Sequence, residues 1–188
     1  MKRNKFITSV LIASASSISA KSSVRENLSR TDKGFKVKAG EGRIHGHIKL
    51  KEINSNILDV KISGKDTYGG FAIFEQTSIS QGRGTPLHVH PLQDEIFYVI
   101  EGEYYFQVGN DKFKMHAGET IFLPKKVPHA WTQVSEKGKM NVTFQPAGKM
   151  EEFFVTVSSL EHEPISKEMA QIFINNEMQV VGPPLKIH

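Results

Sequence analysis

Residues 82–102 read GRGTPLHVHPLQDEIFYVIEG, and this stretch decides how the chain is interpreted. His88 and His90 are two residues apart, so in a strand their side chains point to the same face, with Cα atoms roughly 6–7 Å apart. After a short polar turn, Glu95, Phe97 and Val99 alternate along one face of a second strand. The histidine pair alone is compatible with two readings, a wet polar face or half of a metal site.

A third histidine in a later strand completes a possible ligand set. The set comprises His88, His90, Glu95 and His129. Three imidazoles and one carboxylate suit borderline divalent metals, here one Fe, Mn, Ni, Co, Cu or Zn ion per chain. Four protein ligands leave one or two coordination positions for water or substrate, which is typical of a catalytic site rather than a closed structural one.

Short alternating runs separated by turn residues indicate an all-β fold, either a barrel or a sandwich. The expected strands lie within residues 42–50, 56–63, 69–79, 95–108, 111–115, 119–124, 129–134, 140–145 and 153–159. Near the end of the chain, Met169, Ile172 and Phe173 follow helical spacing, with Ser166 as the expected N-cap. The sequence therefore predicts one β domain with a short C-terminal helix.

Composition excludes several classes of protein. The chain has 188 residues, enough for one domain with its own core. It has no cysteine, so disulfides and thiolate chemistry are excluded. The formal net charge is +4, and Lys2, Arg3 and Lys5 supply three of these charges. What remains lacks the clustered basic stripe of a nucleic-acid-binding protein, so no nucleic-acid partner is expected.

The first 20 residues, MKRNKFITSVLIASASSISA, have a basic start, an apolar run and a small residue at the end. This pattern is typical of a secretory signal peptide cleaved near Ala20 and predicts export to the periplasm or beyond. The alternative is a weakly helical or disordered leader on a cytoplasmic protein. The run is too short and too rich in serine to span a membrane, so no stable membrane association is expected. Residues 21–34 are polar and are interpreted as a linker.

The central stretch resembles the cupin superfamily. Its first motif is matched at Gly82, His88, His90, Glu95 and Gly102. The second is matched at Gly118, Pro124 and His129, whereas Lys126 replaces a glycine and Gln133 an asparagine. We expect the glycine replacement to alter a turn and neither change to remove a ligand. The resemblance implies a single jelly-roll-like β-barrel over residues 35–157, followed by a C-terminal helix and tail over 158–188, assembled as a homodimer.

The wider chain is similar to single-domain bacterial cupins that resemble quercetin 2,3-dioxygenase. The stretches SGKDTYGGFAIFE, QPAGKMEEFF and VVGPPL carry this similarity. It implies a metal-dependent dioxygenase that uses dioxygen on a flavonol or similar enolic aromatic, with Glu95 both ligating the metal and accepting the substrate proton. Another metal-dependent activity, that of an isomerase or a decarboxylating lyase, remains an alternative. So does a non-catalytic barrel that binds a small molecule or a metal.

Other histidines are not assigned to the site. His45 and His47 form a second pair, but no carboxylate follows at matching spacing, so we interpret them as ordinary polar residues. His116, His162 and His188 receive no role. Trp131 shares a strand face with His129, and both a substrate-pocket wall and simple core packing are possible for it.

Overall fold

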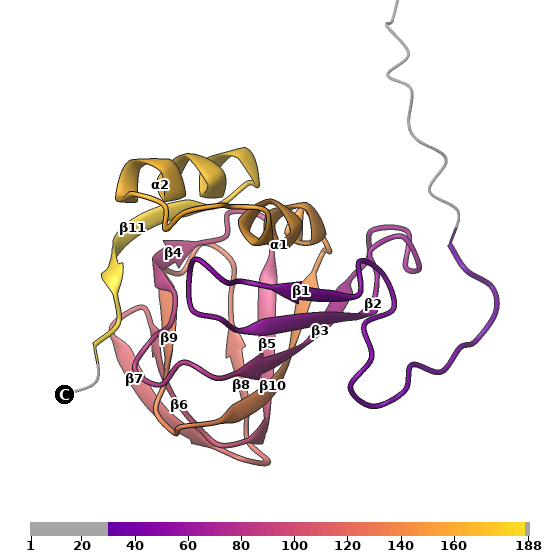
Figure 1. Cartoon of the computed structure of the whole chain (residues 1–188), viewed down its shortest axis with the longest axis horizontal. Coiled ribbons are helices and arrows are strands. Elements are labelled where there is room, and N and C mark those ends of the chain that lie inside the picture. The colour runs from indigo at the N-terminus through magenta and orange to yellow at the C-terminus, as the bar shows by residue number, and fades with distance from the viewer. Residues whose placement is uncertain (1–29, 187–188) are drawn as a thin grey trace, which may run out of the picture.

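The computed structural model describes residues 30–186, which fold into two antiparallel β-sheets and two short helices (Figure 1). One sheet has the order β1-β2-β3-β10-β5-β8 and the other the order β11-β4-β9-β6-β7. Together they form a jelly-roll barrel, as the sequence predicts. The strands are β1 (His47–Lys49), β2 (Ile57–Ile62), β3 (Ala72–Ser78), β4 (Pro86–Val89), β5 (Asp94–Glu101), β6 (Glu103–Val108), β7 (Asp111–His116), β8 (Thr120–Leu123), β9 (His129–Gln133), β10 (Gly138–Gln145) and β11 (Gln179–Pro184).

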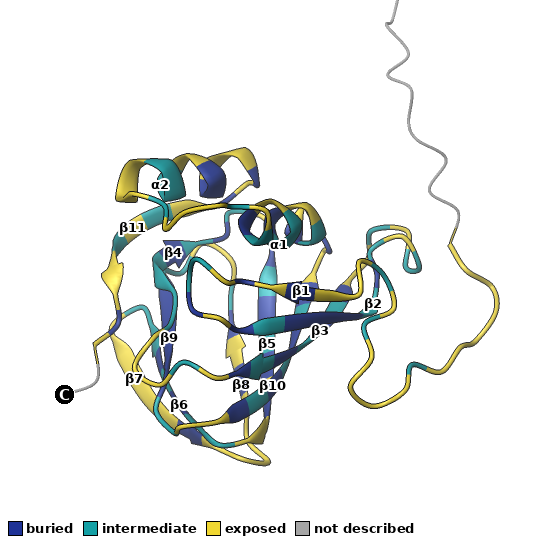
Figure 2. Cartoon of the chain, viewed as in Figure 1, coloured by how far each residue is buried: buried dark blue, intermediate teal, exposed yellow. Residues whose placement is uncertain are grey.

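Alternation along the strands explains why they form. In β3 every second residue is buried, and β10, its antiparallel neighbour, follows the same rule. Most of the inward side chains are apolar, including Phe74, Phe97 and Phe106, and they fill the space between the two sheets. Figure 2 shows the result, with buried strand positions inside the barrel and exposed residues on the loops and the outer surface.

The predicted strand at residues 153–159 is wrong, because this segment belongs to helix α1 (Met150–Ser158). Val155 and Val157 favour extended structure in isolation. Tertiary packing overrides that preference, because only a helix places Met150, Phe153 and Val157 on one face, where all three are buried against the barrel.

The predicted C-terminal helix is confirmed as α2 (Ser166–Asn175), which buries Ile172 and Phe173. Ser166 is the first residue of the helix and not its N-cap, which is Ile165. Beyond the helix, the expected tail contains β11, which pairs antiparallel with β4 and so returns the chain to the barrel. Both helices lie over one end of the barrel, beside β4 (Figure 1).

The predicted leader, residues 1–20, and most of the predicted linker lie outside the described residues. Among the residues that are described, neither helix has the length and apolar character needed to cross a membrane.

Candidate metal centre

The structure brings His88, His90, Glu95 and His129 together, with one ligand atom from each lying within 4.8 Å of all the others. All four side chains are buried. His88 on β4 lies directly opposite His129 on β9 in the five-stranded sheet, whereas Glu95 comes from β5 of the other sheet. His90 directly follows β4, in the turn between β4 and β5. The cluster therefore joins the two sheets from the inside.

Each imidazole is held through its Nδ1 atom. Nδ1 of His88 lies 2.8 Å from the Pro86 carbonyl oxygen, and Nδ1 of His129 lies 3.0 Å from that of Val127. Nδ1 of His90 lies 3.1 Å from Oε1 of Gln93. Because these oxygens only accept, each Nδ1 must carry the hydrogen, which leaves Nε2 with a lone pair for a metal.

The Nε2 atoms converge on the Glu95 carboxylate. Oε1 of Glu95 lies 2.6 Å from Nε2 of His90 and 3.2 Å from Nε2 of His129. Nε2 of His90 is nevertheless a buried atom without an aligned hydrogen-bond partner. Nitrogen lone pairs and a carboxylate oxygen at these distances repel one another unless a proton or a cation lies among them. The residues present therefore fit a divalent cation.

Gln93 fixes the orientation of His90. Its Nε2 donates to the carbonyl oxygens of Pro146 (3.0 Å) and Ala147 (2.9 Å), so the amide can present only Oε1 to His90. Gly148 makes room for this amide: its φ is +51°, and a Cβ atom there would lie 2.4 Å from Nε2 of Gln93. The turn after β10 is thus part of the support of the cluster.

Burial and mutual charge set the protonation states of the cluster. Burial, with the neighbouring His129, lowers the pKa of His88 to about 3. Burial also works to lower the pKa of His90, but the Glu95 carboxylate outweighs it and raises that pKa. Burial opposes ionisation of Glu95, yet His90 and His129 hold its pKa well below the usual range. A neutral His88 and an ionised Glu95 are the forms that bind metal.

Comparison with known proteins relates part of the barrel to a known family. Residues 76–144, which are 69 of the 188 residues, match the family model described as the cupin domain. The matched residues begin on β3 and end on β10, so they include all four members of the cluster.

Among curated proteins, an uncharacterized protein of Methanocaldococcus jannaschii is 42% identical over 48 residues, which are 26% of this chain and 38% of that protein. The match thus spans less than half of the relative's length. KdgF from Halomonas sp. has a TM-score of 0.44 at 15% identity, covering 48% of this chain and 78% of KdgF. An RmlC-like cupin from Shewanella frigidimarina has a TM-score of 0.44 at 20% identity, covering 52% and 82% of the two chains.

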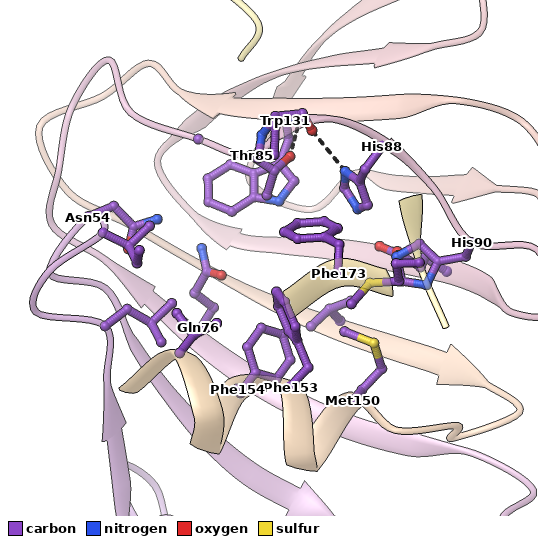
Figure 3. Close-up of a pocket in the computed structure, with 18 of the residues that line it drawn as sticks. Asn54, Gln76, Thr85, His88, His90, Trp131, Met150, Phe153, Phe154 and Phe173 are labelled. Atoms are coloured by element: carbon purple, nitrogen blue, oxygen red, sulfur yellow. Dashed lines mark hydrogen bonds and ion pairs between the residues drawn. The ribbon is translucent and has the colours of Figure 1, made fainter. Parts of the chain in front are cut away.

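A cavity of about 90 Å³ adjoins the cluster inside the cupin barrel (Figure 3). His88, His90 and Glu95 form part of its wall. Helices α1 and α2 close it with apolar side chains: Met150, Phe153, Phe154, Val157, Met169 and Phe173. Trp131 lines the cavity and is 5% exposed, so it both walls the pocket and packs in the core, and the two interpretations of this residue are compatible.

The two departures from the cupin motif leave the fold intact. Lys126 adopts a left-handed conformation with φ of +67°, and its N–H donates to the His90 carbonyl at 2.8 Å. Lysine thus occupies a backbone conformation that glycine adopts more easily, and the expected alteration of the turn stays a prediction. Gln133 is fully buried and bonds four backbone groups at the ends of β3 and β9, so its role is structural.

Among the described residues, the other histidines lie outside the cluster. Nδ1 of His47 lies 2.7 Å from Asp59, and Nε2 of His45 lies 3.7 Å from Glu151. His116 and His162 are exposed beside single glutamates, and His188 is outside the described residues.

Sequence reasoning missed Gln93 and the aromatic residues of α1. Gln93 lies three residues after the ligand His90, and this short spacing could have suggested a hydrogen bond between the two side chains. The partners of Gln93 at Pro146 and Ala147 come from the far end of the domain and have no local signal.

Proposed function

We propose that this cupin is a metal-dependent dioxygenase that acts on an enolic or phenolic aromatic, the class that includes the flavonols. One observation carries the proposal: three imidazoles with free Nε2 atoms and one carboxylate converge at the wall of an enclosed, mostly apolar cavity. A structural metal site needs no such space beside it, whereas a catalytic site does.

The chain's own residues would provide the metal ligands, an apolar wall for the substrate and a proton acceptor. A divalent metal held by His88, His90, Glu95 and His129 would lower the pKa of a coordinated enol or phenol oxygen. The phenylalanines of α1 and α2 form an apolar wall that would pack against an aromatic ring. Glu95 uses Oε1 toward the histidines, and Oε2 has no hydrogen bond to any described residue, so Oε2 is free to take the proton.

Metal content is the first test of this proposal. Wild-type protein purified without chelator should contain about one divalent metal per chain by plasma mass spectrometry. His90→Ala should lose it. His116→Ala, at an exposed histidine outside the cluster, is the matched control and should keep it. Wild-type protein that holds no metal, even after reconstitution with several divalent ions, would contradict the enzyme proposal and leave a ligand-binding barrel.

Turnover is the second test. Oxygen uptake with an enolic aromatic separates a dioxygenase from an isomerase or lyase, which would form product without consuming oxygen. If Glu95 accepts the substrate proton, Glu95→Gln should retain metal but lose about 10²–10⁴-fold in turnover. Unchanged turnover would remove the base role. Export and homodimer assembly stay predictions from the sequence.

A further inference from the structure

Two amide side chains lie at the end of the cavity remote from the metal cluster. In Figure 3, Asn54 and Gln76 occupy one side of the cavity and His88 and His90 the other, with Phe173 between them. Asn54 is 6% exposed and Gln76 is 5% exposed, so both amides are withdrawn from bulk solvent. They lie in a wall that is otherwise mostly apolar.

Each amide has one end satisfied by the protein and one end free. The Asn56 N–H donates to Oδ1 of Asn54 at 3.1 Å, which fixes the orientation of that amide. Gln76 donates from Nε2 to Oγ of Ser78 at 2.8 Å. Across residues 30–186, no hydrogen bond is formed by Nδ2 of Asn54 or Oε1 of Gln76. Neither atom is among the fully buried side-chain atoms that lack a partner, so both are accessible to a small molecule in the cavity, and a ligand that pairs with them gains two hydrogen bonds.

The size of the cavity restricts what can bind between the amides and the cluster. Its volume of about 90 Å³ is below the ~150 Å³ of an engineered cavity that holds benzene. Pockets for drug-sized molecules occupy about 300–1,000 Å³. A flavonol has three rings and belongs to that larger class. The space is therefore smaller than a benzene site: a single ring fits only when the lining side chains change rotamer, and three rings exceed it.

A surface groove adjoins the inner cavity. This groove of about 650 Å³ shares four lining residues with the inner cavity: Ile53, Gly84, Pro86 and Met169. The groove is open to solvent and carries the charged side chains of Arg83 and Glu163. Ile53 and Met169 thus lie between the groove and the cavity, and a substrate that enters from this face would pass them.

We infer that the substrate is a single-ring or smaller enolic compound that carries a second polar group at its far end. Its enolic oxygens face the metal cluster, and the distal hydroxyl or carbonyl is bound by Gln76 and Asn54. This inference rests on the proposed function, because it takes the cluster to be loaded with metal. It excludes the flavonols, which the family resemblance alone would favour.

Three ligands with one chelating group test the inference. Allomaltol and kojic acid are single-ring hydroxypyranones that differ by one distal hydroxyl, and the parent flavonol carries the same hydroxy-ketone on three rings. Binding to full-length protein loaded with redox-inert Zn²⁺ is measured through quenching of Trp131, the chain's single tryptophan, which lines the cavity. Calorimetry provides an independent measurement of each dissociation constant.

Kojic acid should bind about fivefold more tightly than allomaltol, the ratio given by one additional neutral hydrogen bond. The parent flavonol should not bind. Gln76→Met should abolish the difference in affinity between the two pyranones and leave the affinity for allomaltol unchanged. Gln171→Met, on the exposed face of α2, should preserve that difference. Asn54→Asp is the second variant: it keeps the acceptor for the Asn56 N–H but removes the Nδ2 donor. It should weaken the binding of kojic acid more than that of allomaltol.

Two results would overturn the inference without touching the proposed function. These are equal affinities for kojic acid and allomaltol in protein that holds one Zn²⁺ per chain, and flavonol binding as tight as that of the pyranones. Wild-type protein that cannot hold Zn²⁺ would overturn the proposed function and this inference together.

Discussion

Replacing Gln93 with leucine tests whether a residue outside the ligand set controls the metal centre. The side chain is 1% exposed and makes three hydrogen bonds, to Nδ1 of His90 and to the carbonyl oxygens of Pro146 and Ala147. Each buried group left unpaired costs about 1–3 kcal/mol, and apolar packing by leucine offsets part of the sum. We expect the free energy of unfolding to fall by about 3 kcal/mol.

The same change should weaken metal binding. Without Oε1 of Gln93, Nδ1 of His90 loses its hydrogen-bond partner, and loss of such supporting contacts raises metal dissociation constants about 10–100-fold. Gln93→Glu separates the two effects. A carboxylate still accepts from Nδ1 of His90 but cannot donate to the two carbonyl oxygens, so stability should fall while metal affinity is kept.

Urea unfolding measures the stability, and competition with a chromogenic chelator measures the Zn²⁺ affinity. Gln107→Leu is the matched control, because that amide gives a single bond to the Gly109 carbonyl at a turn outside the cluster. It should cost about 1 kcal/mol at most and leave Zn²⁺ affinity unchanged. A dissociation constant for Gln93→Leu within twofold of wild type would refute the reasoning.

Three further predictions concern the support of the barrel. Lys126→Gly should raise the thermal unfolding midpoint slightly, by the equivalent of about 0.5 kcal/mol, because glycine adopts the left-handed conformation without strain; a lower midpoint would contradict this. Gln133→Leu should reduce the free energy of unfolding by about 3 kcal/mol, since one buried and three partly buried backbone groups lose their partner; a loss below 1 kcal/mol would show that water replaces the amide. Arg43 pairs with Asp66 and lowers the pKa of that carboxyl, so the pair stabilises the fold above the carboxyl's unfolded pKa and this contribution disappears as pH falls through the lower folded pKa. Asp66→Asn should therefore cost about 1 kcal/mol in urea unfolding at pH 7 and nothing in strong acid, and a cost independent of pH would point to packing instead of charge.

Local sequence patterns determined the β architecture and the ligand set. Alternation along β3, β5 and β10 reflects burial of one strand face, and this is a local property that the order of residues reveals. His88, His90, Glu95 and His129 could be named in advance because two short motifs give them fixed spacings. Three of them lie on strands, where alternate side chains share a face, and His90 directly follows the end of β4.

Only the tertiary structure decided the helix α1, the cavity and the support of the cluster. Residues 153–159 alternate like a strand, and they form a helix because burying Met150, Phe153 and Val157 together outweighs local β-preference. The amides of Asn54 and Gln76, the carbonyls that orient Gln93 and the phenylalanines of α1 and α2 come from segments far apart in the chain. Spacing along a chain predicts which residues share a face, but the volume enclosed between faces depends on how distant segments pack, and that volume limits the size of any molecule that could lie beside the ligand cluster.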